Sequence, residues 1–270
     1  MKNVILVTGA SAGMGKEFVK ELLKDGNIVY GAARRVNKMD DIKSLGVKVL
    51  EMDVTDEESM VKGINAIIKA EGRVDVLINN AGFGSYGAVE DVAIGDARYQ
   101  LEVNVFGAAR LMQLVIPHMR KHNYGRIINI SSIGGKVALP LGGWYHASKF
   151  ALEALSDATR NEVKQFGIDV IVIEPGGVKS EWGGIALDNL VKKSSEGVYS
   201  KMANNLVTAM KGTAGKEADP MVIVKLVKDA INAKTPKTRY SGGYMAGLVL
   251  FLRKLLSDRL LDKVMMSQIK

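Results

Sequence analysis

Six short apolar runs alternate with longer segments of helical period, and this alternation constrains the fold of the chain more than any other feature. The runs are continuous and β-branched, which is typical of strands buried on both faces of a parallel sheet. Strand–helix alternation predicts right-handed crossovers and a doubly wound parallel sheet with helices on both faces. The predicted strands are Val4–Val7, Ile28–Ala32, Val47–Met52, Val74–Ile78, Arg126–Ile130 and Val170–Ile173.

Helices are expected between these strands and after them. No long linker or repeat divides the 270 residues, so we expect one domain over 1–270. Residues 181–217 are rich in Gly, Ser, Lys and Asn, and we expect a substrate loop there with one short helix. In the C-terminal extension, 240–270, the apolar stretch 244–266 is expected to pack on its own protein rather than on another subunit or a membrane surface. The predicted helices are 14–25, 38–45, 57–71, 96–122, 144–167 and 220–233.

Composition excludes several classes of protein. The chain has no Cys, which excludes disulfides, thiolate nucleophiles and Cys-ligated metals. His118 and His122 stand four apart, but no third ligand is evident nearby, so no metal site is expected. The net charge of +8 comes from scattered residues rather than a basic run, and we expect no nucleic-acid partner. The N-terminal apolar run is too short for a signal peptide, which predicts a cytoplasmic protein without membrane contact.

A glycine-rich loop follows the first predicted strand. Thr8-Gly9-Ala10-Ser11-Ala12-Gly13-Met14-Gly15 leads into a helix, whose free N–H groups and positive dipole end suit a pyrophosphate. Gly9 allows a tight turn, Gly13 lets the backbone approach the ligand, and Gly15 lets the helix pack closely. The spacing differs from the GxGxxG of most dinucleotide folds, and a plain turn is the alternative. Its place in a strand–loop–helix unit favours a nucleotide cofactor.

The end of the second strand predicts which nicotinamide nucleotide binds. NAD sites usually carry an acid there, which bonds the ribose 2′-hydroxyl. This chain instead has Ala33 followed by Arg34 and Arg35. Guanidinium groups form paired hydrogen bonds with a 2′-phosphate, which favours NADP(H) over the alternative of two surface arginines. Asp53, after the third strand, is expected either to bind the adenine amino group or to serve as a turn or cap residue.

Tyr145 and Lys149 stand at i and i+4 of a predicted helix and therefore face the same way. A free phenol has a pKa of about 10, and a nearby ammonium lowers that pKa by stabilising the phenolate. Tyr145 can then exchange a proton with a carbonyl or an alcohol. Ser132, at the carboxyl end of a strand, is placed to polarise the same oxygen. Asn104, polar within an apolar helix, is expected to bond backbone or an ordered water.

Taken together, and in their order along the chain, the motifs resemble those of the short-chain dehydrogenase/reductase family. They comprise Thr8–Gly15, Asn79-Asn80-Ala81-Gly82, Asn104, Ser132, Tyr145-x-x-x-Lys149 and Pro175-Gly176, and they cover about residues 3–180. The resemblance implies a single-domain Rossmann fold and a catalytic tetrad of Asn104, Ser132, Tyr145 and Lys149. It also implies the cofactor contacts, in which Ser180 replaces the Thr common in the family. These are Gly9, Ser11, Gly13, Met14, Gly15, Arg34, Arg35, Asp53, Val54, Asn80, Ala81, Gly82, Tyr145, Lys149, Pro175, Gly176, Val178 and Ser180.

Two segments, Ser132–Phe150 and Glu174–Trp182, look most like the hydroxysteroid and retinol dehydrogenase-like branch of that family. This implies an NADP(H)-dependent oxidoreductase that interconverts a lipophilic carbonyl compound and an alcohol. Substrate choice is expected to rest on residues 83–96, 133–144 and 181–217, where Phe83, Tyr86, Trp144 and Trp182 either line an apolar pocket or are ordinary aromatic residues. A β-ketoacyl reductase and a non-catalytic NADP sensor are the alternatives. Helices 96–122 and 144–167 are expected to build a homodimer or homotetramer, as in the family.

Overall fold

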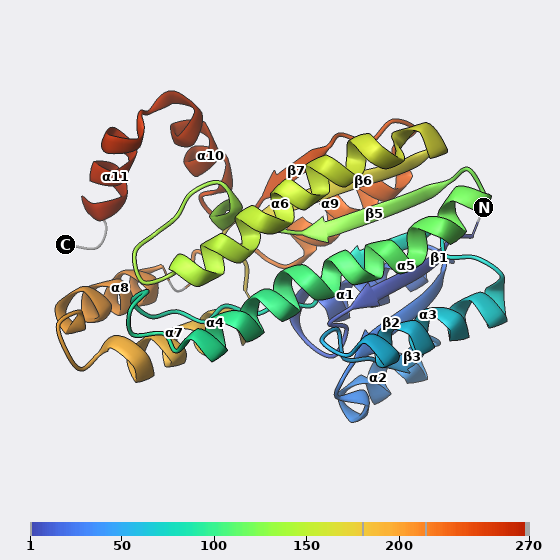
Figure 1. The fold of residues 1–270 in the computed structure, drawn as a ribbon, viewed down its shortest axis with the longest axis horizontal. Coiled ribbons are helices and arrows are strands. Elements are labelled where there is room, and N and C mark those ends of the chain that lie inside the picture. Colours follow the sequence, from blue (N-terminus) through green and yellow to red (C-terminus); the bar gives the residue numbers. More distant parts are fainter. Residues whose placement is uncertain (1, 180, 214, 268–270) are drawn as a thin grey trace.

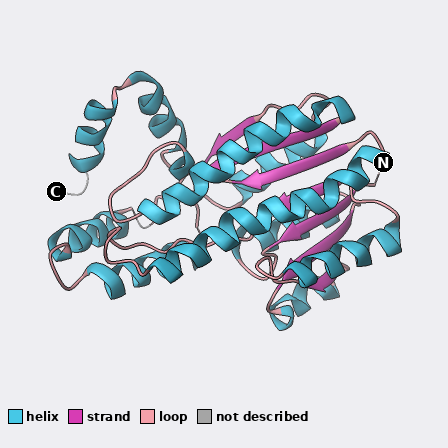
Figure 2. Cartoon of the chain, viewed as in Figure 1, coloured by secondary structure: helices cyan, strands magenta, loops and turns pink. Residues whose placement is uncertain are grey.

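The computed structural model describes residues 2–179, 181–213 and 215–267, and these contain one parallel sheet in the strand order β3-β2-β1-β4-β5-β6-β7 (Figures 1 and 2). The doubly wound Rossmann-type sheet predicted from the apolar runs is therefore confirmed. The order reverses between β1 and β4, and such a reversal is where open α/β sheets bind ligands. The strands are β1 Val4–Thr8, β2 Ile28–Ala33, β3 Lys48–Glu51, β4 Val76–Asn79, β5 Gly125–Ile130, β6 Ile168–Pro175 and β7 Arg239–Gly242.

Helices cover both faces of this sheet, because alternate residues of each strand point to opposite faces. Ile5 and Val7 of β1 join a core with α1 (Gly13–Lys24), α2 (Asp40–Ser44) and α9 (Met221–Asn232). Val4 and Leu6 join the opposite core with α3 (Glu57–Glu71), α5 (Gly107–Lys121) and α6 (Gly143–Val163). Since both faces are covered, the strands read as continuous apolar runs.

Helix 96–122 of the prediction is one continuous helical stretch with an irregularity. It consists of α4 (Ile94–Leu101), a π-helical turn (Glu102–Phe106) and α5. Short 3₁₀ turns lie at Val36–Met39, Ile133–Gly135 and Lys164–Phe166. Strand β7 was not predicted from the sequence. Its four residues are partly exposed and lack an apolar run, so only pairing with β6 makes them a strand.

The expectation of a loop with one short helix over 181–217 is wrong. The structure has two helices there, α7 (Glu181–Ser194) and α8 (Ser200–Gly212). Their buried residues Ala186, Leu190, Ala203 and Leu206 form a separate apolar cluster together with Tyr145. The polar composition of the segment describes its outer face, whereas the few apolar residues fix its helical packing.

The C-terminal stretch forms two helices, α10 (Ala246–Leu255) and α11 (Asp258–Ser267). Both helical pairs, α7–α8 and α10–α11, lie beyond the carboxyl ends of the strands (Figure 1). Among the described residues, no helix combines the length and the apolar character needed to cross a membrane.

Candidate active site

The glycine loop joins β1 to the first turn of α1 and adopts backbone angles that suit glycine. Gly9 has φ +67° and Gly13 has φ +53°, both in the left-handed region. A Cβ on Gly15 would lie 2.4 Å from the Gly9 carbonyl oxygen, so only glycine allows this approach. Ala12, at the N-cap of α1, offers no capping side chain, and the first turn holds no acid. The N–H groups and the dipole of this turn therefore suit an anion.

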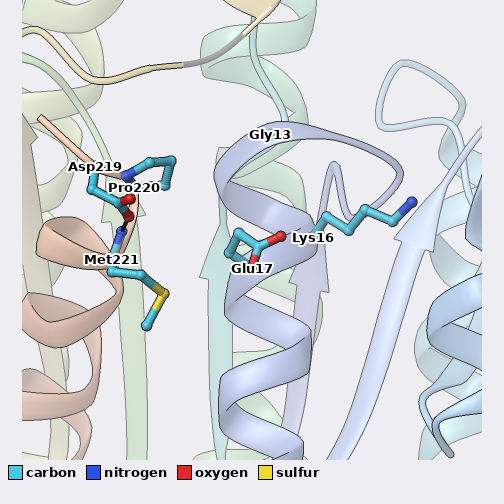
Figure 3. Close-up of a pocket in the computed structure, with 6 residues that line it drawn as sticks. All are labelled: Gly13, Lys16, Glu17, Asp219, Pro220 and Met221. Carbon is cyan, nitrogen blue, oxygen red and sulfur yellow. Dashed lines mark hydrogen bonds between the residues drawn. The ribbon is translucent and has the colours of Figure 1, made fainter. Parts of the chain in front are cut away.

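A hollow of about 370 Å³ opens beside this loop, between the start of α1 and the start of α9 (Figure 3). Gly13, Lys16 and Glu17 line one side of it. Asp219, Pro220 and Met221 line the other side. This position, at the carboxyl edge of the sheet and next to the glycine loop, fits the phosphate portion of a dinucleotide.

Thr8 connects the glycine loop to the end of β4, a role that the glycine motif did not predict. Its hydroxyl accepts hydrogen bonds from the backbone N–H groups of Asn80 and Ala81, both at 3.0 Å. The Asn80 side chain donates to the Thr8 carbonyl at 2.9 Å. Asn80 and Ala81 therefore lie against the glycine loop, as a shared cofactor site requires. The available sequence signal was a hydroxyl residue at the end of β1, directly before Gly9.

The arginines after β2 lie at the edge expected for the adenosine ribose. Arg34 donates from Nη1 to the Tyr99 hydroxyl at 2.7 Å, and the same nitrogen lies 4.0 Å from Asp53. The Arg34 side chain is 62% exposed, so it has room to meet a ligand. Asp53 accepts from the N–H and the hydroxyl of Thr55 through Oδ1, so it serves as a turn residue. Arg35 is exposed and precedes the 3₁₀ turn at Val36–Met39.

The structure brings Tyr145 and Lys149 together with Ser132 at the carboxyl end of β5. Tyr145 of α6 is buried and hydrogen bonded to Ser132, which follows β5. Lys149, one turn further along α6, is also buried and donates from Nζ to the Ile130 carbonyl at 2.9 Å. The three groups come from one helix and one strand end, as the i, i+4 spacing predicted.

The pKa values of this pair differ from the sequence-based expectation. Burial raises the pKa of Tyr145 to about 12, and the hydrogen bond with Ser132 acts in the opposite direction. Burial lowers the pKa of Lys149 to about 8, while the charge of Glu153 acts to raise it. The predicted lowering of the tyrosine pKa is therefore wrong. The Lys149 ammonium reaches the Ile130 carbonyl, and loss of solvent dominates at both groups.

Asn104 lies in the π-helical turn between α4 and α5, a kind of irregularity often found at functional sites. Its side-chain oxygen accepts from the Phe83 N–H at 3.0 Å, and its Nδ2 donates to the Phe83 carbonyl at 2.9 Å. Nδ2 also lies 3.0 Å from the Ser148 hydroxyl. The expected bond to backbone is confirmed. A Cβ on Gly82 would lie 3.1 Å from the Asn104 oxygen and 3.6 Å from Lys149 Nζ, so the two side chains meet beside Gly82.

The segment after β6 closes the far side of the site. A Cβ on Gly176 would lie 2.3 Å from the Tyr244 carbonyl oxygen, so this glycine permits close packing against the start of the C-terminal extension. Ser132 Oγ lies 3.5 Å from the Pro175 carbonyl. Val178 forms a parallel bridge with Ala218. Ser180 and the side chain of Trp182 lie outside the described residues.

Of the remaining predicted contacts, Ser11 and Met14 lie within the glycine loop, and both are partly buried. Val54 packs against α5, because a Cβ on Gly107 would lie 2.4 Å from the Val54 carbonyl oxygen. All three residues therefore belong to the carboxyl edge of the sheet. Among the aromatic candidates, Phe83 contacts Tyr99 with ring centroids 5.6 Å apart and the ring planes tilted by 41°.

Two aromatic residues lie beside Tyr145: Tyr86, a predicted pocket candidate, and His146, which no sequence motif indicated. Tyr86 lies with its ring centroid 5.8 Å from that of Tyr145, and both belong to the apolar cluster with α7 and α8. His146 is buried, and its Nδ1 lies 3.0 Å from the Gly134 carbonyl. Burial lowers the pKa of His146. These contacts surround Tyr145 with aromatic and apolar groups.

An ionic network with two buried carboxylates, Glu153 and Glu174, lies behind Lys149. Glu153, one turn further along α6, pairs with Lys136 at 2.7 Å and with Arg239 of β7 at 2.9 Å. Arg239 also pairs with Glu174, at the end of β6, at 3.3 Å. The network links α6, β6 and β7, so it helps hold the segment that carries Lys149 against the end of the sheet.

A glycine loop on a Rossmann-type sheet, followed by Ser132, Tyr145 and Lys149 at one carboxyl edge, defines a dinucleotide-dependent oxidoreductase. Residues 3–186 match the short chain dehydrogenase family. The chain therefore belongs to that family, as its motifs predicted, whereas its place in the hydroxysteroid and retinol dehydrogenase-like branch stays a prediction.

Relatives match over nearly the whole chain. The chain is 35% identical over 259 residues to the probable short-chain type dehydrogenase/reductase VdlC of Helicobacter pylori, covering 96% of this chain and 95% of that protein. It is 33% identical over 266 residues to the uncharacterized oxidoreductase YbbO of Escherichia coli, covering 98% and 94%. A short-chain dehydrogenase from Streptomyces avermitilis superposes with a TM-score of 0.83 at 30% identity, covering 98% and 94%.

Proposed function

We propose that this protein is an NADP(H)-dependent reductase that converts a lipophilic ketone or aldehyde to its alcohol, and that can run the reverse oxidation. The observation that carries the proposal is the placement of the Tyr145 side chain. It is hydrogen bonded to Ser132 and sits within an apolar cluster at the carboxyl edge of the sheet. A proton donor in apolar surroundings, beside a loop that suits a nucleotide, fits the reduction of the carbonyl group of an apolar substrate.

Tyr145 is the proposed proton donor and acceptor. Because burial raises its pKa to about 12, the phenol holds its proton at neutral pH and is ready to donate it to a carbonyl oxygen. Ser132 holds the same oxygen by a second hydrogen bond and so orients it. Lys149 supplies positive charge beneath the site, and Asn104 fixes the Phe83 segment beside it. When bound, NADP(H) supplies or accepts the hydride.

The residues present fit a phosphorylated nicotinamide nucleotide. The uncapped first turn of α1 suits the pyrophosphate, and the exposed Arg34 suits a 2′-phosphate. Two similar proteins support this choice. A relative from Ornithobacterium rhinotracheale, 32% identical over 282 residues, is an NADPH-dependent 3-dehydrocapnine reductase. The solved structure of ElxO, 27% identical with a TM-score of 0.73, has NADP bound.

A lipophilic substrate is supported by the side chains around Tyr145. Tyr86 and Leu141 pack with Leu190 of α7 and Leu206 of α8, so the proton donor lies in apolar surroundings. A relative from Bacteroides thetaiotaomicron, a 3-ketodihydrosphingosine reductase, is 44% identical over 174 residues, which is 64% of this chain and 63% of that protein. A ketone on a long alkyl chain is therefore the first substrate to test.

We propose that the protein is cytoplasmic and forms a homodimer or homotetramer. The exposed Phe106 next to α5, and Phe150 and Leu155 on α6, offer apolar contact area for a partner copy. The predicted contact between these two helices of each subunit stays a prediction.

The test compares wild type with Tyr145→Phe, using NADPH and a panel of 3-keto long-chain lipids, steroid ketones, retinal and β-ketoacyl thioesters. Both proteins should bind NADPH equally, and kcat of the variant should fall by about 10³-fold because the proton donor is lost. Equal turnover by both would contradict the role of Tyr145. Preference for the thioesters would make the protein a β-ketoacyl reductase, and NADPH binding without any turnover would make it a sensor.

A further inference from the structure

The outer faces of α10 and α11 carry large apolar side chains that contact no other part of the described chain closely enough to bury them. On α10 these are Leu248, Phe251 and Leu255, which are 50%, 60% and 66% exposed. On α11 they are Leu260 and Val264, at 50% and 39%. Positions 248, 251 and 255 lie on one face of a helix, as do 260 and 264. The exposed residues therefore form stripes rather than scattered singles.

The opposite faces of the two helices are already in use. Val249 and Leu261 are buried against Val137, which follows the 3₁₀ turn after Ser132. A Cβ on Gly176 would lie 3.1 Å from the Cβ of Ala246, at the start of α10. The sequence-based expectation that this stretch packs on its own protein therefore holds for one side only. The other side carries the exposed stripes, and Figure 1 shows both helices beyond the carboxyl ends of the strands.

Exposed cations accompany these stripes. Lys254, Arg259 and Lys263 are exposed, and within residues 2–179, 181–213 and 215–267 none of them forms an ion pair. Asp258, one of two acids in these helices, is paired with Arg253 at 2.8 Å. Lysine is depleted in the cores of protein interfaces, which argues against a second protein as the partner. Apolar stripes flanked by Lys and Arg instead fit the surface of an anionic lipid bilayer.

We infer that α10 and α11 lie in the plane of an anionic membrane surface, with Phe251 and Leu255 entering the acyl boundary. The same two helices rest on the segments that follow Ser132 and Pro175. Docking therefore places the candidate active site directly next to the bilayer. This departs from the sequence-based expectation of no membrane contact, and the exposed stripes are the reason. The inference concerns where the protein acts and does not depend on the proposed reaction.

The test is co-sedimentation of the full chain with vesicles of phosphatidylglycerol and phosphatidylcholine, compared with vesicles of phosphatidylcholine alone. Wild type should bind the anionic vesicles, and added salt should weaken binding. Phe251→Asp/Leu255→Asp should weaken binding by about 100-fold. Val198→Asp is the matched control, because Val198 is 89% exposed between α7 and α8, outside the stripes, and should bind as wild type.

A second variant tests the same inference if the aspartate variant fails to fold. Lys254→Gln/Arg259→Gln/Lys263→Gln alters no apolar contact, and it should weaken binding to anionic vesicles by about fivefold per removed charge. Tyr145→Phe should bind vesicles like wild type even though its kcat is expected to fall by about 10³-fold, so this result is separable from the proposed reaction. Absence of binding by wild type would overturn the inference. The inference would also be overturned if the aspartate variant and the glutamine variant both bound like wild type. It would equally be overturned if the stripes only joined two copies of the chain in solution.

Discussion

The two C-terminal helical pairs differ from the sheet with its covering helices in how each uses its apolar side chains. In the sheet region, Ile5, Leu6 and Phe18 are fully buried, and contacts are so close that Gly15 admits no side chain. In α7 and α10–α11, by contrast, Ile185, Phe251 and Leu255 are largely exposed, and a Cβ on Gly184 would meet no atom within 4 Å. The sheet region is therefore closely packed, whereas the helical pairs keep apolar side chains exposed to solvent.

This difference matches the different binding requirements of a cofactor and a substrate. A cofactor with one shape is held by backbone groups and small residues whose positions the sheet fixes. A lipophilic substrate, and the surface that delivers it, requires apolar area that is not consumed by folding. We therefore expect substitutions in the sheet region to affect stability and nucleotide binding. Substitutions in the helical pairs should affect access and specificity.

The largest effect is expected for Gly15→Ala. The new Cβ would lie 2.4 Å from the Gly9 carbonyl oxygen and 2.5 Å from the Asn80 amide nitrogen, so the loop must shift. Overpacking of this kind should lower the free energy of unfolding by about 3 kcal/mol and abolish NADPH binding. Urea denaturation and nucleotide fluorescence measure both. A variant as stable as wild type would show that this loop is not tightly packed.

A smaller effect is expected for Arg34→Ala. Losing a charge-assisted contact with a 2′-phosphate should raise the Kd for NADPH by about 10- to 30-fold and leave the Kd for NADH within about threefold. Titration calorimetry with both nucleotides measures this. Arg259→Ala, in the helical pair, is the matched control and should change neither constant. Equal losses for both nucleotides would place Arg34 outside the phosphate site.

The pH dependence of reduction should also originate in the sheet region. Lys149 has a pKa lowered to about 8 by burial, whereas Tyr145, with a pKa of about 12, stays protonated well above that pH. As pH rises through 8 the ammonium is lost, so kcat/KM should fall by about tenfold per unit above that point. Lys263→Gln, on α11, should leave the midpoint unchanged. A profile that stays flat between about pH 7 and 10 would contradict the role of Lys149.

The smallest effect is expected for Gly184→Ala in α7. This glycine is exposed, and a Cβ there meets no atom within 4 Å. Alanine favours helix over glycine, so the free energy of unfolding should rise by about 0.5 kcal/mol or slightly more. Thermal denaturation measures the change. Destabilisation would mean that α7 depends on contacts that glycine alone permits, and the contrast with Gly15 would then fail.

Much of the sheet region could be predicted from residue patterns. The runs at Val4–Val7 and Ile28–Ala32 became β1 and β2, because burial on both faces leaves an apolar signature that needs no partner to be read. The i, i+4 spacing of Tyr145 and Lys149 placed both on one side of α6. Only one short helix was predicted over 181–217, where the structure has α7 and α8, because polar outer faces dominate the composition of this segment. Strand β7 was missed because it depends on pairing with β6.

The pKa values and contacts of the site residues were less predictable than the identity of those residues. The tyrosine pKa depends on how much solvent each group loses and on where the Lys149 amine points, and neither follows from spacing along a helix. The hydrogen bonds between Asn104 and Phe83 and the ion pair between Glu153 and Arg239 also join residues that are distant in the sequence. Patterns along the chain report local periodicity, so contacts between distant segments leave no such trace.

The sequence by itself determined the parallel sheet, the glycine loop and the identity of the residues at the carboxyl edge, because backbone geometry and burial act on each segment locally. Only the tertiary structure decided the protonation of Tyr145 and Lys149, the helical form of 181–212, and which side of α10 and α11 stays uncovered. Desolvation and burial are properties of the assembled fold, since they depend on every segment that packs around a group.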